Sequence, residues 1–185
     1  MGESPMPRKP QTRWLAARAA QSVMNAATRT AYISAGSNLG DRAATLREAL
    51  RALDETPGVR VASASSLHET DPVGGVPQPL FLNLAARLEI AATLTPETLL
   101  AEMQCIERHF GRRRETEIHW GPRTLDLDLL LFGDETRATD FLTLPHPRLW
   151  ERAFVLVPLR EVADAADALL REKLKKLPAN DPRVR

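Results

Sequence analysis

The sequence predicts an α+β sandwich, in which helices pack on an antiparallel sheet. Segments with the two-residue period of strands alternate with segments whose apolar residues have helical spacing. Gly133-Asp134 follows an apolar strand as a turn signal, and tight turns of this kind join antiparallel strands. The length of 185 residues suits one domain with a buried core. We expect that domain at residues 30–165, between an N-terminal extension at 1–29 and a charged C-terminal segment at 166–185.

Charge and cysteine content narrow the possible partners. The formal net charge is +1, so no overall field favours nucleic acid or a membrane surface. Every apolar run falls short of the roughly 20 residues that a membrane-spanning helix needs. Cys105 is the only cysteine, which is compatible with a reducing compartment. We expect a cytoplasmic, monomeric protein that binds neither nucleic acid nor membrane.

The first 29 residues differ from the rest, with five basic side chains and one acidic side chain. Arg18 interrupts their longest apolar stretch, which argues against a secretory signal. A disordered extension and an amphipathic, transit-like segment remain alternatives. We expect this extension to be disordered or partly helical.

The first half of the chain reads as strand, helix and two further strands. Asp41 is a typical helix cap, and Pro57-Gly58 ends the helix that it starts. Five proline and glycine residues between Thr70 and Leu80 exclude regular structure there. The expected order is a strand at 31–35, a turn at 36–40, a strand at 59–69, a loop at 70–80 and a strand at 81–91.

The second half begins with a helix whose first residues are Thr95-Pro96, because proline is favoured at the first helical position. Gly111 ends this helix. The expected order is then a loop at 111–122, a strand at 124–132, a return strand at 142–144, a helix at 153–163 and a fraying helix in the C-terminal segment.

The strongest chemical signal is a pair of acids in the strand at 124–132. Alternation turns Leu125, Leu127, Leu129 and Leu131 toward the core, so Asp126 and Asp128 share the opposite face. Their β-carbons are then roughly 7 Å apart. A hard divalent cation relieves the repulsion between two such carboxylates, and oxygen ligands favour magnesium or calcium over zinc. The alternative is a strand with one solvated face.

Basic residues flank this pair. Arg112, Arg113 and Arg114 precede the strand, as does Arg123. Arginines near paired carboxylates suit a polyphosphate and its metal, while a solvated loop is the alternative. Asn83 is polar in an apolar strand and shares its face with Phe81, so amide and ring together could hold a flat heterocycle.

The combined motifs resemble the 6-hydroxymethyl-7,8-dihydropterin pyrophosphokinases of folate biosynthesis. The resemblance covers about residues 30–163, and its most specific part is Trp120-Gly-Pro-Arg-Thr-Leu-Asp-Leu-Asp-Leu129. The other matching motifs are Ala31-Tyr-Ile-Ser-Ala-Gly-Ser-Asn-Leu-Gly40, Thr70-Asp-Pro-Val-Gly74, Phe81-Leu-Asn83, Gln104-Cys-Ile-Glu-Arg108, Gly111-Arg112, Leu144-Pro-His146 and Arg152-Ala-Phe-Val155. It implies a ferredoxin-like sandwich. This chain departs from many members at Phe81, where they have tyrosine.

The resemblance also implies a role for each matching residue. Asp126 and Asp128 would hold two magnesium ions that bridge the ATP phosphates, with Arg112 and Arg123 as the other catalytic residues. ATP would contact Gln104, Glu107, Arg112, Trp120, Arg123, Leu129, His146 and Arg152. The pterin would contact Thr70, Asp71, Val73, Phe81, Asn83 and Phe154, with the two phenylalanines on either side of its ring.

The resemblance therefore implies transfer of pyrophosphate from ATP to 6-hydroxymethyl-7,8-dihydropterin, with release of AMP. Positioning and charge neutralisation supply most of the rate in such reactions. Two alternatives keep the same residues: a two-metal phosphohydrolase or nuclease with water as the nucleophile, and a module that binds nucleotide or pterin without turnover.

Overall fold

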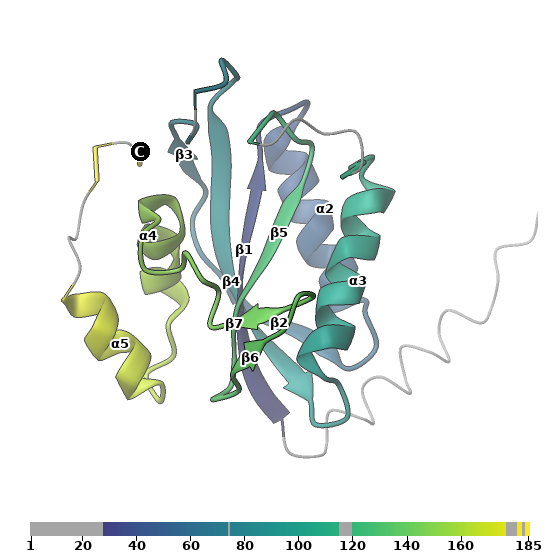
Figure 1. Cartoon of the computed structure of the whole chain (residues 1–185), viewed down its shortest axis with the longest axis vertical. Coiled ribbons are helices and arrows are strands. Elements are labelled where there is room, and N and C mark those ends of the chain that lie inside the picture. The colour runs from purple at the N-terminus through teal and green to yellow at the C-terminus, as the bar shows by residue number, and fades with distance from the viewer. Residues whose placement is uncertain (1–27, 74, 115–119, 177–180, 183) are drawn as a thin grey trace, which may run out of the picture.

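A central antiparallel sheet has helices on both of its faces (Figure 1). This computed structural model describes residues 28–73, 75–114, 120–176, 181–182 and 184–185. The sheet has the order β2-β4-β1-β5, and the short β3 also pairs with β4. Its strands are β1 (Thr28–Ser37), β2 (Val59–Ala64), β3 (His68–Thr70), β4 (Phe81–Ala91) and β5 (Asp126–Phe132). A separate two-stranded sheet consists of β6 (Arg137–Ala138) and β7 (Thr143–Leu144).

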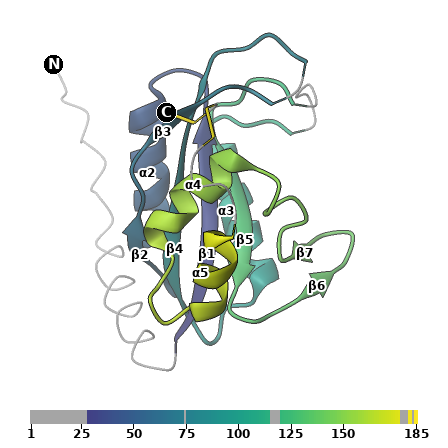
Figure 2. The ribbon, with the colours of Figure 1, turned by 90° about the vertical axis from the view of Figure 1, so that its left-hand side faces the viewer.

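In the described part of the chain, four helices form the two outer layers. One layer contains α2 (Arg42–Asp54) and α3 (Pro96–His109), and the other contains α4 (Ala153–Val162) and α5 (Ala168–Lys175) (Figures 1 and 2). The succession β1-α2-β2-β4-α3-β5 is the ferredoxin-like arrangement, with β3 as an addition and α4 and α5 as a third layer.

The predicted helix starts are confirmed. The Asp41 side chain accepts the Ala44 N–H (3.0 Å) at the start of α2. The Thr95 hydroxyl accepts the Thr98 N–H (3.2 Å) at the start of α3. Gly111 follows α3 with a φ of 86°, a conformation that glycine adopts without strain.

Each face of the sheet has its own apolar core. Leu84, Ala86, Leu88 and Ile90 of β4 pack under α2 and α3, as their alternation predicts. The opposite face of the sheet, including Tyr32 and Ala85, packs under α4 and α5. The fold therefore buries apolar residues on both faces of β4 and β1.

Three details of the predicted strands are wrong. The single strand at 59–69 is divided into β2 and β3, since Ser65 to Leu67 leave the ladder. The return strand at 142–144 pairs with β6 instead of β5. Leu131 packs on the α4 side, away from Leu125, Leu127 and Leu129. A bulge causes this last difference: β1 pairs with Leu129 and then with Leu131, so Leu130 is an extra residue that reverses the alternation.

The two ends of the chain were expected to lie outside the domain. β1 begins at Thr28, and the prediction for the extension at 1–29 otherwise falls on residues outside the described part. In the C-terminal segment, α5 buries Leu170 and Leu174 against the α4 side of the sheet. None of the described helices combines the length and the apolar character of a membrane-spanning segment.

Candidate active site

Three neighbouring strands place the key polar residues in one row. Gly36 of β1 pairs with Asn83 of β4 on one side and with Asp126 of β5 on the other. Two residues earlier in β1, Ser34 pairs with Asp128. The period of two therefore puts both predicted metal ligands and the predicted pterin ligand on the same face of the sheet.

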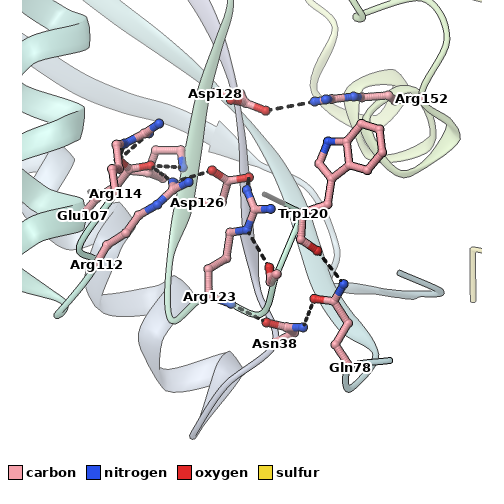
Figure 3. A network of polar contacts seen from close by, with 12 residues as sticks. Asn38, Gln78, Glu107, Arg112, Arg114, Trp120, Arg123, Asp126, Asp128 and Arg152 are labelled. Carbon is pink, nitrogen blue, oxygen red and sulfur yellow. Dashed lines mark hydrogen bonds and ion pairs between the residues drawn. The ribbon is translucent and has the colours of Figure 1, made fainter. Parts of the chain in front are cut away.

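Two arginines surround the carboxylate of Asp126 (Figure 3). Arg112 Nη1 donates to Asp126 Oδ1 (2.5 Å) and Arg123 Nη1 donates to Oδ2 (2.9 Å). Burial by itself would raise the pKa of Asp126, but the positive charges of Arg112 and Arg123 outweigh burial and hold it below the ordinary value. Asp126 is therefore ionised at neutral pH.

Asp128 has a weaker cationic partner. Its Oδ2 accepts from Arg152 Nη1 at 3.3 Å (Figure 3). Burial, and then the negative charge of Asp126, raise the pKa of Asp128 to about 7. The two carboxylates therefore differ. Asp126 is ionised at neutral pH, whereas a further positive charge near Asp128 would stabilise its ionised form.

Glu107 is a buried carboxylate that anchors this site from α3. It is 1% exposed, and its Oε1 accepts the main-chain N–H of Leu127 (2.8 Å), the residue between the two aspartates. The same carboxylate accepts from Arg112 (2.5 Å) and from Arg114 (Nη2, 2.6 Å). Glu107 thus positions β5 and Arg112 together (Figure 3).

A second set of hydrogen bonds joins three loops at the end of the sheet (Figure 3). Asn38 Oδ1 accepts the Arg123 N–H (2.8 Å), and Asn38 Nδ2 donates to Gln78 Oε1 (3.0 Å). Gln78 Nε2 then donates to the carbonyl of Trp120 (2.7 Å). Trp120 has a φ of 60°, which is rare for a residue other than glycine and is typical of binding sites. The loop at 70–80 is therefore linked to the segment that precedes β5.

The side of the row near β3 suits a flat polar ring. Asn83 is 4% exposed and donates from Nδ2 to the Thr70 hydroxyl (2.6 Å). Its Oδ1 lies against Gly36, where an added Cβ would come within 2.6 Å of that oxygen. Arg123 lies over the Phe81 ring (6.0 Å) and Arg152 lies over the Phe154 ring (5.6 Å). Each predicted stacking ring thus has a cation beside it.

One cavity brings together eleven of the sixteen predicted site residues. They include both aspartates, three predicted ATP contacts and all six predicted pterin ligands. The eleven are Thr70, Asp71, Val73, Phe81, Asn83, Trp120, Arg123, Asp126, Asp128, Arg152 and Phe154. An apolar slot and a charged end are therefore parts of one continuous site.

The other five predicted residues are not among those that line this cavity. Arg112 and Glu107 are buried behind Asp126, and Gln104 is half-buried on α3. Leu129 is 3% exposed in the core under α2 and α3, so a contact with nucleotide would have to come from its main chain. His146 accepts the Arg148 N–H at Nδ1 (3.2 Å), and burial, followed by the charge of Arg152, lowers its pKa.

Three residues of the cavity were not predicted: Ser34, Gly36 and Arg148. The first two belong to a segment that reads as a buried strand and a turn, and only their pairing with β4 and β5 reveals their place. Arg148 lies over the Trp120 ring (5.8 Å), although 28 residues separate them in the sequence. His146 lies between two prolines in the same segment, but nothing in the spacing singles out Arg148.

The donor set fits a hard divalent cation. Asp126 and Asp128 offer only oxygen, and burial, followed by the negative charge of Asp126, raises the pKa of Asp128. The described residues contain no group of three or more histidine, cysteine, aspartate or glutamate side chains that could hold a metal. Magnesium suits such a site, because it is commonly held by one or two carboxylates together with water and substrate phosphates.

Comparisons with known proteins show the family of this chain. Residues 32–164 match the family described as 7,8-dihydro-6-hydroxymethylpterin-pyrophosphokinase (HPPK). The chain is 49% identical over 137 residues to the 2-amino-4-hydroxy-6-hydroxymethyldihydropteridine pyrophosphokinase of Bacillus subtilis, covering 74% of this chain and 80% of the relative. The protein of the same name from Methylorubrum extorquens is 43% identical over 150 residues, covering 80% and 92%.

Longer proteins also match over this region. The mitochondrial folate synthesis bifunctional protein of Arabidopsis thaliana is 46% identical over 134 residues, which cover 72% of this chain and 23% of the relative. The wild-type HPPK-DHPS of Plasmodium falciparum, solved with pteroate, has the same fold, with a TM-score of 0.56, 16% identity and coverage of 80% of this chain and 42% of that chain. The match over residues 32–164 and the identity to relatives of similar length show that this chain belongs to the 7,8-dihydro-6-hydroxymethylpterin-pyrophosphokinase family.

Proposed function

We propose that this chain transfers a pyrophosphoryl group from ATP to the hydroxymethyl oxygen of 6-hydroxymethyl-7,8-dihydropterin, giving AMP and the pterin diphosphate in folate biosynthesis. One observation carries the proposal beyond family membership. Asn83 and Asp126 flank the same residue, Gly36, so the proposed pterin ligand and the proposed metal ligand open onto one cavity. The reacting hydroxyl and the phosphates would then meet within one short row of the sheet.

The pterin would occupy the apolar end of the cavity. Phe81 and Phe154 would contact the two faces of its ring, and Asn83 would hydrogen-bond its polar edge. Thr70 holds the Asn83 amide in place, and Asp71 and Val73 form the adjoining wall. These contacts would orient the hydroxymethyl group toward the aspartates.

The phosphates would occupy the charged end, where arginines now contact carboxylates. Arg112 and Arg123 bind Asp126, and Arg152 binds Asp128. Bound nucleotide offers these guanidinium groups phosphate oxygens, which they bind in bidentate geometry. We propose that the arginines then turn from the carboxylates to the phosphates, which leaves both carboxylates available for cation.

Asp126 and Asp128 would hold two magnesium ions, which would neutralise the phosphate oxygens and the charge that develops on AMP. The residues of the chain orient the two substrates, offset phosphate charge and exclude water from the transferred group. For the rest of the nucleotide, we propose contacts with Gln104, Trp120, the main chain of Leu129 and the Nε2 atom of His146. Glu107 would act through Arg112, because its carboxylate already accepts three groups.

We also propose that the enzyme is a cytoplasmic monomer. The single cysteine supports a reducing compartment, and the proposed reaction needs residues of one chain only. Light scattering after size exclusion and fractionation of cells test these two points.

The deciding experiment is a coupled assay for AMP with ATP, magnesium and hydroxymethyl-dihydropterin. AMP should form only when pterin is present, and chelation of the metal should stop it. Asp126→Ala is the matched control, because its carboxylate lies at the proposed metal site and not in an apolar core. Nucleotide breakdown without pterin would indicate the phosphohydrolase. Binding without any turnover would indicate a non-catalytic module.

A further inference from the structure

Two residues near the end of the chain return to the outer edge of β3. Val184 forms an antiparallel bridge with Thr70. The Glu69 N–H donates to the Arg185 carbonyl (2.9 Å), and the Arg185 N–H donates to the Glu69 carbonyl (2.8 Å). Figure 2 shows the C-terminus beside β3. We call Val184 and Arg185 the C-terminal clasp, since they pair with the side of β3 that faces away from β4.

The strand that the clasp holds forms a wall of the proposed pterin pocket. β3 has only three residues, His68 to Thr70. Its last residue accepts the amide of Asn83, and the chain then continues through Asp71 to Val73, which line the cavity. So short an edge strand has few hydrogen bonds of its own, and unpaired edge groups exchange readily with water. The two main-chain hydrogen bonds of the clasp therefore add to the pairing with β4 and to the side-chain contacts of His68 with Glu161 and of Glu69 with Arg42 in ordering this wall.

The side chains of the clasp contact the same wall. Arg185 Nη2 lies 3.3 Å from Asp71 Oδ1, with 55% and 39% of the two side chains exposed. Val184 lines a second cavity whose residues shared with the first are Thr70, Asp71, Val73, Arg148, Arg152 and Phe154. An exposed ion pair contributes little by itself, so the main-chain pairing should carry most of the effect.

We propose that the C-terminal clasp is a positioning element for the pterin: Val184 and Arg185 keep β3 and the Asp71–Val73 wall in the conformation that binds this substrate. A pocket that is ordered only part of the time binds its ligand more weakly, in proportion to the ordered fraction. The clasp contacts the wall of the pterin pocket and is not among the groups bound to Asp126 or Asp128. Its loss should therefore weaken pterin binding and leave nucleotide binding alone. This inference depends on the proposed function.

A matched set of substitutions separates the parts of the clasp. Arg185→Pro removes the N–H that donates to Glu69 and constrains the main chain. Arg185→Ala removes only the ion pair with Asp71. Arg185→Gly keeps the N–H but loosens the pairing, so it serves if the proline variant does not fold. Lys176→Ala, at an exposed helix end, is the control for a change of charge.

Two measurements decide the proposal. In hydrogen exchange, the Glu69 amide should exchange faster in Arg185→Pro than in the parent or in Lys176→Ala. In steady-state kinetics, Arg185→Pro should raise the KM for pterin about fivefold, with the KM for ATP and kcat unchanged. Arg185→Ala should raise it less than twofold, and Arg185→Gly should lie between the two.

Faster exchange with an unchanged KM for pterin would overturn the proposal, as would an equal rise in both KM values. Failure of the proposed function looks different, because the parent chain itself would then form no AMP that depends on pterin. Direct titration of pterin into the parent and into Arg185→Pro, with a non-hydrolysable ATP analogue present, keeps the comparison independent of turnover.

Discussion

Asn83 and Asp126 are neighbours across a single glycine, since β1 pairs Gly36 with both of them. The glycine matters because each partner carries a side chain that faces the cavity. A larger residue between them would fill the space where the pterin and the phosphates are proposed to meet. Predictions about the site follow from this row and from the charges around it.

Gly36→Ala should weaken pterin binding. The new Cβ would lie 2.6 Å from Asn83 Oδ1 and 3.8 Å from a ring carbon of Phe81, so the amide must move. Loss of a well-placed hydrogen bond to a buried group corresponds to a rise of about tenfold in the KM for pterin. Gly75→Ala is the control, since a Cβ at that position meets nothing within 4 Å. An equal loss for ATP and pterin would contradict a specific effect on Asn83.

Asp128→Asn should abolish transfer and stabilise the protein near pH 8. The pKa of Asp128 is raised from 3.8 to about 7, so the folded state binds this proton more tightly than the unfolded chain does. Its stabilising contribution is present below about pH 4 and is lost as pH rises through about 7. The side-chain amide of Asn carries no charge at any of these pH values, so the variant does not lose stability as the pH rises.

The expected result for Asp128→Asn is a higher Tm than the parent at pH 8 and little difference near pH 4. Turnover should fall by a factor on the order of 100 or more. Melting curves at both pH values and the AMP assay measure these effects. If the Tm difference between variant and parent were the same at pH 4 and at pH 8, Asp128 would not be the group that titrates.

Binding of nucleotide with magnesium should release a proton from Asp128 near pH 6. A cation beside the carboxylate favours its ionised form, so binding should tighten as pH rises toward 7. Calorimetry with a non-hydrolysable ATP analogue, in buffers of different ionisation enthalpy, measures the protons released. Asp128→Asn corrects for protons that the nucleotide itself loses. Equal release from parent and variant would place the proton elsewhere.

Glu107→Gln should destabilise the fold. Glu107 is 1% exposed and is the buried partner of Arg112 and Arg114. Removing one partner of a buried ion pair costs about 3–5 kcal/mol, because the remaining charge has lost its compensation. Glu48→Gln is the control, since its pair with Arg51 is exposed and should change stability by less than about 1 kcal/mol. Urea unfolding at pH 7 compares the two, and similar losses for both would contradict the anchoring role of Glu107.

Much of the site follows from local patterns. The period of two in β4 predicts that Phe81 and Asn83 share a face, and the same period predicts that Asp126 and Asp128 do. The helix starts at Asp41 and Thr95 could also be predicted from the sequence, because a capping side chain binds a main-chain N–H within four residues of itself. Such features depend on neighbours in the sequence.

Which strands pair with one another could not be predicted correctly from the sequence. A turn at Gly133 predicted that β5 would pair with the next strand, but β5 pairs with β1 and β7 pairs with β6. The antiparallel sheet was therefore predicted correctly, although from a hairpin that does not form. Which distant strand pairs with β5 depends on how the whole sheet buries its two faces. The residue pattern of a single strand does not contain that information.

The sequence by itself determined on which face of a strand the proposed site residues lie, because alternation is a property of the local backbone. Only the tertiary structure decided how their charges are balanced. The adjacent Arg112, Arg113 and Arg114 suggest mutual repulsion without a bound anion, yet Glu107 forms ion pairs with the first and the third. That carboxylate also accepts the N–H of a β5 residue 20 positions away. Such a contact depends on the packing of α3 against β5, so it cannot be predicted from the spacing of residues along the chain.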